Sequence, residues 1–285
     1  MTIVKKLEKY LSYQAYQKSP YKSVKHSTYF PVYDKLFLPY VNKNITFVEI
    51  GVLGGGSLFM WRNFFGENAR IIGIDINPEA KKWEEHGFEI YIGSQSDKDF
   101  WKNFKNKVDK IDILLDDGGH TFTQQIITFD SILDQINNNG LIVVEDVHTS
   151  YMAEFGGPSK YSFIEYSKNI VDGINYRFSS LSSKKFERKI WNINFYESIV
   201  VFEINQECSD ITSVPTENNG IDLDTADLRY KDSQSVKTFI GLATKFKFLN
   251  KFVFFRVIKN YLLKYFIVFR NSFINRKLKS YFKYF

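Results

Sequence analysis

Apolar and polar residues alternate in blocks over most of the chain, and the length of each block indicates a strand or a helix. Five short, almost wholly apolar runs predict buried strands, over residues 46–50, 70–75, 88–92, 111–116 and 140–145. The longer runs between them predict helices, over residues 58–65, 78–86, 97–104 and 123–136. Strands of this kind, alternating with helices, are typical of a parallel sheet that is covered on both faces.

Two further strands, over residues 189–196 and 198–204, follow each other so closely that they predict an antiparallel hairpin. Residues 137–140 indicate a turn before the fifth strand, because three asparagines precede a glycine. The pattern therefore predicts an α/β fold with a doubly wound, Rossmann-like sheet, which is mostly parallel and closes with the antiparallel hairpin.

The regions before and after this alternation differ from it in character. Residues 1–24 are polar with a helical pattern, Pro31 should keep the residue before it extended, and residues 32–40 predict a short helix. We therefore expect an N-terminal helical cap or lid, a core, a linker and a C-terminal basic helical tail, over residues 1–40, 41–207, 208–236 and 237–285.

Charge separates the last part from the rest of the 285-residue chain. Residues 237–285 hold 12 of the 38 Lys and Arg and none of the 32 Asp and Glu, so the remainder carries a net negative charge. Apolar and aromatic residues recur between the basic ones, which predicts one or two basic amphipathic helices. Such helices fit an anionic membrane surface, a contact in a homo-oligomer or an intramolecular cap. Nucleic acid is disfavoured, because the sequence shows no recognition module for it.

The composition favours a reducing compartment. Cys208 is the single cysteine, so no disulfide can form within the chain. The first residues hold no apolar run of signal-peptide length, and no stretch reaches the roughly 18 apolar residues that a membrane span needs. We expect a cytoplasmic protein, peripheral at the inner face of the cytoplasmic membrane if the basic region binds lipid.

The stretch FVEIGVLGGGS, residues 47–57, predicts a binding cradle. A buried strand runs into a turn that contains Gly51 and Gly54, and a helix follows from about Ser57. Glycine lets the backbone approach a ligand closely, and a helix N-terminus offers unpaired N–H groups, which together favour a nucleotide-like ligand. The dinucleotide pattern GxGxxG is absent, but Asp75 follows Gly51 at about the distance of a carboxylate that binds ribose hydroxyls.

Acidic residues stand at the carboxyl ends of four of the five predicted parallel strands, as Glu49, Asp75, the pair Asp116–Asp117 and the pair Glu145–Asp146. Because these ends meet at one edge of the sheet, Asp117, Glu145 and Asp146 could converge on one Mg²⁺ ion, which prefers oxygen ligands. Each acid taken alone is also an ordinary helix N-cap. His120, three residues after Asp117, is our candidate general base, and His148 is a weaker second candidate.

The ordered runs VEIGVLGGGS, GIDINP, GSQSD, LLDDGGH and GLIVVEDVHTSY resemble class I S-adenosylmethionine-dependent methyltransferases. More narrowly, they are similar to the macrocin and mycinamicin sugar O-methyltransferases and the cephalosporin-hydroxylase-like group beside them, in the branch found in bacterial surface-polysaccharide clusters. The resemblance covers residues 25–203, and its first part is the run KHSTYFPVYD. The basic C-terminal region lies outside it.

The resemblance implies a set of site residues. The cofactor S-adenosyl-L-methionine would be bound by Glu49, Gly51, Gly54, Ser57, Asp75, Ser94, Gln95 and Asp116. Mg²⁺ or another divalent cation would be held by Asp117, Glu145 and Asp146, and the catalytic residues would be His120 and Asp117. The lid and the acceptor side would comprise Lys25, His26, Tyr29, His148 and Tyr151.

The implied activity is metal-assisted methyl transfer to a sugar hydroxyl of O-antigen, capsule or lipooligosaccharide, or of a small-molecule glycoside or other natural product. The expected partner is a sugar or glycan acceptor. Two other interpretations use the same residues. One is a non-catalytic scaffold docked at a membrane, which the retained acidic residues disfavour. The other is an iron oxygenase with His120, His148 and Asp117 as ligands.

Overall fold

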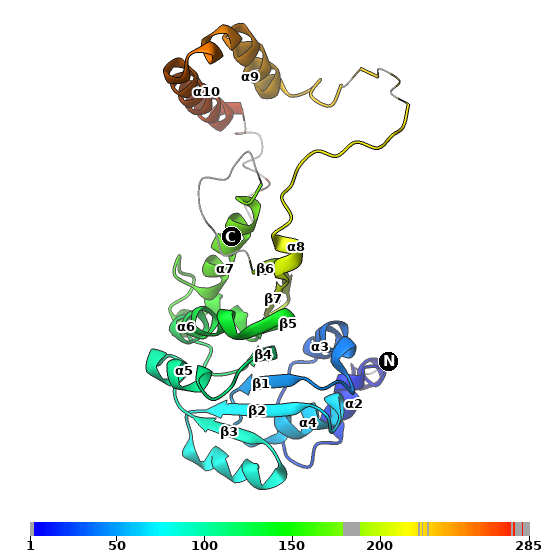
Figure 1. Ribbon diagram of the computed structural model, residues 1–285. Coiled ribbons are helices and arrows are strands. Elements are labelled where there is room, and N and C mark those ends of the chain that lie inside the picture. Colours follow the sequence, from blue (N-terminus) through cyan, green and yellow to red (C-terminus); the bar gives the residue numbers. More distant parts are fainter. Residues whose placement is uncertain are drawn as a thin grey trace. The chain divides into compact units, whose positions relative to one another are not determined.

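The computed structural model of the chain describes residues 3–178, 189–274, 276 and 281, apart from residues 222, 224 and 227. The chain divides into two compact units, Met1–Pro215 and Thr216–Phe285. The first unit holds a sheet with helices on both faces (Figure 1). This sheet decides where the candidate functional residues lie.

The sheet confirms the predicted α/β architecture. Its seven strands lie in the order β3-β2-β1-β4-β5-β7-β6, and all neighbours are parallel except β5–β7 and β6–β7. The strands span Thr46–Ile50 (β1), Arg70–Asp75 (β2), Glu89–Ile92 (β3), Ile111–Asp116 (β4), Ile136–Val144 (β5), Ile190–Tyr196 (β6) and Ile199–Ile204 (β7). The chain order reverses between β1 and β4, and ligands of doubly wound sheets bind at such a point, outside the carboxyl ends of the strands.

Helices cover both faces of the sheet (Figure 1). One face carries α2 (Leu11–Gln17), α3 (Tyr29–Phe37) and α4 (Gly56–Phe65), and the other carries α5 (Lys98–Lys105), α6 (Phe122–Ile132) and α7 (Phe163–Asn175). Phe47 of β1 packs with the first group and its neighbour Val48 with the second. Successive side chains of a strand point to opposite faces, which is why the apolar run of β1 is continuous.

Short helices complete the first unit. They are α1 (Ile3–Leu7), α8 (Gln206–Ser209) and the 3₁₀ helices η1 (Leu38–Tyr40), η2 (Pro78–His86), η3 (Leu133–Gln135), η4 (Val147–Tyr151) and η5 (Ala153–Phe155). The segment predicted as a helix over 78–86 is thus a 3₁₀ helix. The helix predicted over 123–136 ends at Ile132 and continues as η3. The helix α7 has no counterpart among the sequence predictions.

Two local predictions are wrong. Residues 137–140 do not form a turn: Ile111 pairs with Ile136 and Ile113 with Leu141, so the polar residues between these pairs bulge within β5. The residue before Pro31 is not extended, because α3 begins at Tyr29 and includes it. Pro31 lies in the first turn of α3, where backbone N–H groups have no acceptor within the helix. The missing N–H of proline therefore costs the helix no hydrogen bond.

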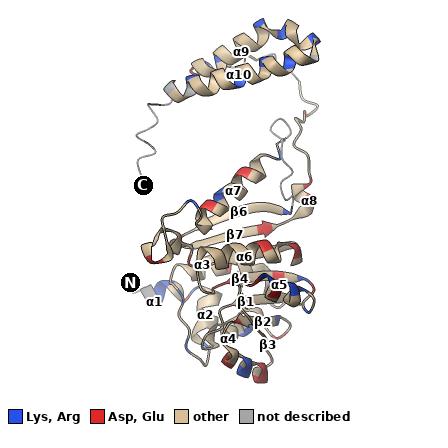
Figure 2. Cartoon of the chain, turned by 90° about the vertical axis from the view of Figure 1, so that its left-hand side faces the viewer, with Lys and Arg blue, Asp and Glu red and all other residues tan. Residues whose placement is uncertain are grey.

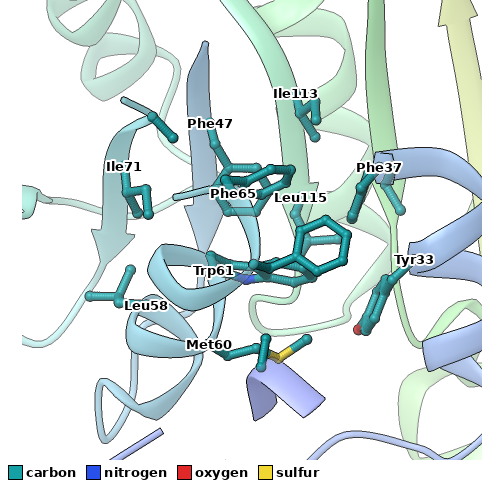
Figure 3. Close-up of a cluster of buried hydrophobic side chains, with 14 of the residues drawn as sticks. Tyr33, Phe37, Phe47, Leu58, Met60, Trp61, Phe65, Ile71, Ile113 and Leu115 are labelled. Atoms are coloured by element: carbon teal, nitrogen blue, oxygen red, sulfur yellow. The ribbon is translucent and has the colours of Figure 1, made fainter. Parts of the chain in front are cut away.

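Trp61 of α4 is the centre of the hydrophobic core on the first face (Figure 3). It is fully buried, and its ring lies 5.0 to 5.7 Å from those of Phe37, Phe47 and Phe65. Its indole Nε1 donates a hydrogen bond to Glu49 Oε1 at 3.0 Å. A buried indole N–H needs such a partner, and the core therefore positions an acidic residue of β1 directly.

The second unit consists of α9 (Gln234–Lys245), η6 (Lys247–Lys251) and α10 (Val253–Ile274), in agreement with the predicted helical region. Figure 2 shows Lys and Arg along both α-helices and no Asp or Glu. Within the described residues, every helix is too short or too polar to cross a membrane. Residues 275, 277–280 and 282–285 of the predicted region lie outside the described residues.

Candidate active site

A carboxylate braces the glycine turn after β1. Asp75, at the end of β2, accepts hydrogen bonds from Val52 N and Leu53 N, both at 2.9 Å. Gly51 has a φ of +90°, and a Cβ at this residue would lie 2.1 Å from the carbonyl oxygen of Asp117. Glycine is therefore required where the chain leaves β1. The predicted contact of Asp75 with ribose stays a prediction.

An open cavity of about 480 Å³ lies beside the turn, at the carboxyl ends of β1, β2, β4 and β5. The predicted site residues that line it are Gly51, Gly54, Ser57, Asp75, Ser94, Gln95, Asp117, His120, Glu145, Asp146, Lys25, His26 and Tyr29. The predicted residues outside its lining are Glu49, Asp116, His148 and Tyr151. The cavity thus joins the glycine turn to the acidic residues of β4 and β5.

Glu49 and Asp116 lie behind the cavity wall. Glu49 is fully buried and accepts hydrogen bonds from Ser57 Oγ at 2.7 Å and from Trp61 Nε1, and burial raises its pKa to about 7. Asp116 accepts from Gln95 Nε2 at 2.9 and 3.1 Å, and burial raises its pKa to about 6. Both carboxylates position residues that line the cavity. Direct contact of either one with a cofactor stays a prediction.

Gln95 connects the loops that follow β3 and β4. Its Oε1 accepts a hydrogen bond from Gly119 N at 2.9 Å, and its Nε2 donates to Thr128 Oγ1 at 3.1 Å as well as to Asp116. A Cβ at Gly118 would lie 1.9 Å from the same Oε1. The glycine pair in DDGGH therefore allows Gln95 to approach the loop backbone.

Lys25 lies inside the acid cluster, which comprises Glu49, Asp117, Glu145 and Asp146. Its side chain is 2% exposed, and Nζ lies 2.6 Å from Asp117 Oδ2, 3.0 Å from Glu145 Oε2 and 3.8 Å from Glu49 Oε1. Burial disfavours the ammonium form, but the three carboxylates outweigh burial and hold the pKa of Lys25 well above its ordinary value. Lys25 is therefore a positive charge shared by the ends of β1, β4 and β5.

Two tyrosines of α3 reach the same acid cluster. Tyr33, which is fully buried, donates to Glu145 Oε1. Tyr29 donates to Asp146 Oδ1, and its hydroxyl oxygen lies at hydrogen-bond distance, 2.9 Å, from Ser198 Oγ. Residues four apart share one face of a helix, and this spacing is the signal in the sequence that could have added Tyr33 to the predicted Tyr29. Ser198, in the turn between β6 and β7, carried no signal.

Asp117, His120 and Asp146 form a group that could hold a metal ion. One ligand atom of each residue lies within 4.8 Å of the other two. Nδ1 of His120 is buried without a hydrogen-bond partner among the described residues. His120 and Asp146 also adopt positive φ angles of 58° and 55°, which are uncommon for residues other than glycine. Two carboxylates and an imidazole suit a divalent cation, so these residues fit such an ion.

Glu145, the third predicted metal ligand, contacts Lys25 through Oε2 and Tyr33 through Oε1. A carboxylate can accept about four bonds, so these two contacts leave room for a metal. Burial raises the pKa of Glu145, while the charge of Lys25 opposes that shift. The role of Glu145 as a ligand stays a prediction.

Two more imidazoles lie near Asp146. Nδ1 of His148 shares a hydrogen bond with Ser198 Oγ and lies 3.8 Å from Asp146 Oδ1. Nε2 of His26 lies at the same distance from Asp146 Oδ1, on a side chain that is 65% exposed. His148 does not belong to the metal group found within the described residues, which disfavours the iron ligand set. Tyr151, at the end of η4, is 55% exposed.

Residues 48–147 match the family model of a methyltransferase domain. This stretch begins in β1, contains the glycine turn and the DDGGH loop, and ends one residue after Asp146. Over these residues the chain therefore has the sequence pattern of a methyltransferase domain. The predicted likeness to the macrocin and mycinamicin sugar O-methyltransferases is also confirmed, by the relatives that follow.

Three of the curated relatives are O-methyltransferases by name. The 8-demethyl-8-alpha-L-rhamnosyl tetracenomycin-C 2'-O-methyltransferase of Streptomyces olivaceus is 28% identical over 62% of this chain and 50% of its own length. The demethylmacrocin O-methyltransferase of Streptomyces fradiae is 29% identical over 62% of this chain and 49% of its own length. The mycinamicin VI 2''-O-methyltransferase of Micromonospora griseorubida is 29% identical over 65% of this chain and 50% of its own length. The chain therefore spans about half the length of the curated relatives it matches.

A solved structure has the same fold. It is the MycE methyltransferase from the mycinamycin biosynthetic pathway in complex with Mg and SAH (S-adenosylhomocysteine), with a TM-score of 0.63 and 26% identity over 72% of this chain and 55% of that one. A second MycE structure, with Mg, SAH and mycinamycin VI, gives a TM-score of 0.62 at 27% identity. These matches confirm the predicted methyltransferase fold.

Proposed function

We propose that the protein transfers a methyl group from S-adenosyl-L-methionine to a sugar hydroxyl with the help of a divalent cation. The observation that carries this proposal is that Asp117, His120 and Asp146 line the same cavity as the glycine turn. Names of relatives support it, since the curated ones are O-methyltransferases of glycosylated natural products and MycE was solved with Mg and SAH. The cofactor and the metal would thus meet in one space.

The cofactor would occupy the part of the cavity beside the glycine turn. Gly51 and Gly54 let a ligand approach the backbone there, and Ser57 lies at the start of α4. Asp75 would accept from the ribose hydroxyls in addition to the backbone N–H groups that it already holds. Ser94 and Gln95 would lie at the adenine, while Glu49 and Asp116 would act from behind the wall.

Asp117 and Asp146 would hold the divalent cation, with Glu145 as a third ligand. Their oxygens are the hard donors that Mg²⁺ prefers. Bound there, a divalent cation would supply Lewis-acid chemistry that lowers the pKa of the acceptor hydroxyl. The lid and acceptor side would include Lys25, His26, Tyr29, His148 and Tyr151.

His120 would act as the general base. It would take the proton of the acceptor hydroxyl while the oxygen–carbon bond forms and the sulfur–carbon bond of the cofactor breaks. Asp146 Oδ2, which lies 3.4 Å from His120 Nε2, would stabilise the resulting imidazolium. Because His120 also belongs to the candidate metal group, the base and ligand roles have to be separated by experiment.

Three measurements on His120→Ala separate these roles: methyl transfer, calorimetric binding of SAH and binding of Mn²⁺. If His120 is the general base, its loss should lower the rate of methyl transfer by about 100-fold or more. The affinities for SAH and for Mn²⁺ should then stay unchanged. Weaker Mn²⁺ binding would make His120 a ligand, and full activity would remove it from the mechanism. His86→Ala is the matched control, because His86 does not line the cavity. No binding of SAH by the wild type would overturn the proposed function itself.

We propose that the acceptor belongs to a bacterial surface polysaccharide, such as O-antigen, capsule or lipooligosaccharide. A small-molecule glycoside, the acceptor type in the names of the relatives, is the alternative. The basic C-terminal region supports the first, because a lipid-linked glycan is reached at a membrane surface. Mass spectrometry of surface glycans from cells with and without the gene tests this. Glycans from cells with the gene should contain a sugar that is heavier by one methylene group than the same sugar in cells without it. Identical glycans in the two kinds of cell would favour the small-molecule acceptor.

We further propose that this region holds the protein at the inner, anionic face of the cytoplasmic membrane. Phe254, Ile258, Tyr261 and Tyr265 of α10 are 38–70% exposed and recur every three or four residues, so they share one face of the helix. At 100° per residue, Arg256 and Lys259 fall on the opposite side of the helix, Lys264 falls between the two sides, and the region holds no acidic residue. An amphipathic helix of this kind suits an anionic lipid surface.

Vesicle sedimentation tests the membrane proposal. The protein should bind vesicles that contain phosphatidylglycerol, bind pure phosphatidylcholine vesicles weakly, and dissociate at high salt, because basic residues supply much of the attraction. Ile258→Asp should weaken binding. Ile211→Asp, at an exposed apolar residue of the first unit, is the matched control and should leave binding unchanged. Equal binding to both vesicle types would contradict the proposal.

A further inference from the structure

Lys25 fills a cation position formed by the ends of three strands, which we name the inner position. Its Nζ lies 2.6 Å from Asp117 Oδ2 and 3.0 Å from Glu145 Oε2, and Glu49 Oε1 is 3.8 Å away. The side chain is 2% exposed. A metal ion could bind at this point only if it displaced the ammonium group, because both would use the same two oxygens.

A second cation position, which we name the outer position, lies beside the first. It is formed by Asp117, His120 and Asp146, whose ligand atoms lie within 4.8 Å of one another. Asp117 therefore belongs to both positions. A carboxylate can bind one cation through each of its oxygens, as carboxylates do when they bridge two ions.

The charges of the acid cluster limit how many cations it can take. Buried carboxylates close to one another are stable only when nearby positive charges compensate them. The four carboxylates Glu49, Asp117, Glu145 and Asp146 carry one negative charge each when ionised. Lys25 supplies one positive charge, one divalent ion supplies two, and the sulfonium group of the cofactor supplies the fourth. A second divalent ion would exceed this balance.

We propose that Lys25 is a built-in second cation of this site: it occupies the inner position, so that the protein binds a single divalent ion at the outer position. Lys25 is then a positioning residue, which holds Asp117 and Glu145 in place for the ion. The inference rests on the proposed function, because the outer position has to bind a divalent cation. It also makes the segment before α3 a fixed part of the metal site.

Counting bound Mn²⁺ ions tests the inference. The probe is Mn²⁺ added to the full-length protein, with free Mn²⁺ measured by electron paramagnetic resonance. The wild type should bind one ion per chain. Lys25→Met keeps an unbranched side chain but lacks the ammonium group at its end, which leaves the inner position vacant and uncharged, so this variant should bind two ions. Lys25→Arg, the matched control, keeps the charge and should bind one.

The counts also show how the inference could fail. Two ions in the wild type, or a single ion of unchanged affinity in Lys25→Met, would overturn it and leave the proposed function intact. A wild type that binds no Mn²⁺ would overturn the metal part of the proposed function and this inference with it. If Lys25→Met does not fold, Lys25→Gln carries the test, because its neutral amide can still donate a hydrogen bond to the carboxylates of the inner position. Two ions are then expected, and a single ion of unchanged affinity would overturn the inference.

Discussion

Buried carboxylates are held in this protein by aromatic donors. Glu49 accepts from the indole of Trp61, and Glu145 accepts from the hydroxyl of Tyr33. In each pair the ring packs in the hydrophobic core (Figure 3), while its polar atom donates to the carboxylate. A buried carboxylate without a hydrogen-bond donor lowers the stability of the folded protein. Single aromatic residues of the core therefore decide whether the acid cluster keeps its geometry.

Replacing Tyr33 by Phe should separate the role of its hydroxyl from that of its ring. The ring still packs against Phe37 and Trp61, but Glu145 loses a donor, which should lower the free energy of unfolding by about 1–3 kcal/mol. Urea denaturation measures this change, and methyl transfer should fall with it. Tyr40→Phe is the control, since Tyr40 donates to the carbonyl of Asn139 instead of a carboxylate. An unchanged stability in Tyr33→Phe would mean that Glu145 does not need this donor.

Glu49 should make stability depend on pH. Burial raises its pKa to about 7 in the folded protein, whereas the value in an unfolded chain is about 4.3. The folded state therefore holds this proton more tightly, so the free energy of unfolding should fall as pH rises from about 4 to about 7. Glu49→Gln should remove this contribution. Urea denaturation at several pH values measures it, and parallel curves for variant and wild type would contradict the assignment.

At the scale of elements, the N-terminal helices form part of the site wall. Asp34 of α3 accepts hydrogen bonds from Leu11 N and Ser12 N at 2.7 and 2.8 Å, at the start of α2. On its other side, α3 places Tyr29 and Tyr33 against the acid cluster. The predicted cap is therefore tied both to its own helices and to the strand ends, which restricts any opening of the segment that carries Lys25.

The turn between β1 and α4 is the element most sensitive to a small change. Gly51→Ala should cost well over 1–2 kcal/mol, roughly the penalty of a left-handed conformation alone, because the added Cβ would also meet the Asp117 carbonyl oxygen. Gly87→Ala is the matched control: Gly87 has a similar φ of +80°, but a Cβ there meets nothing within 4 Å. Thermal denaturation should show a larger loss of stability in Gly51→Ala than in Gly87→Ala, and calorimetry should show weaker SAH binding in Gly51→Ala only. Equal losses in both variants would contradict the role of this close approach.

At the scale of the whole molecule, the first unit, Met1–Pro215, contains the candidate site. Every residue that lines the cavity lies between Lys22 and Asp146, and the hydrophobic clusters on both faces of the sheet lie between Leu7 and Ile204. We thus assign the proposed catalysis to the first unit and the proposed attachment to a surface to the second unit, Thr216–Phe285.

A protein that ends at Pro215 should therefore fold and bind SAH as tightly as the full chain. Its vesicle binding should be lost, because α9 and α10 are absent. Thermal denaturation, calorimetry and vesicle sedimentation of the two proteins measure these effects side by side. Weaker SAH binding by the shortened protein would show that the second unit acts on the site.

The sequence by itself determined most of the sheet. Four of the five predicted parallel strands agree with the observed ones closely, because buried strands need continuous apolar runs that glycine turns and polar loops interrupt. It also placed Asp117, Glu145 and Asp146 together, since the carboxyl ends of parallel strands share one edge. It misjudged residues 137–140, because a bulge lets polar residues interrupt a strand without ending it.

Only the tertiary structure decided what surrounds those carboxylates. Lys25 lies 92 residues before Asp117 and 120 before Glu145, and Tyr33 lies 112 before Glu145. No local pattern specifies such contacts, because they depend on how α3 packs across the sheet. From the sequence, the acidic residues predicted a metal site, and Lys25 was expected to belong to the lid. The structure puts Lys25 among the acids, where its charge is shared by the three strands that end there.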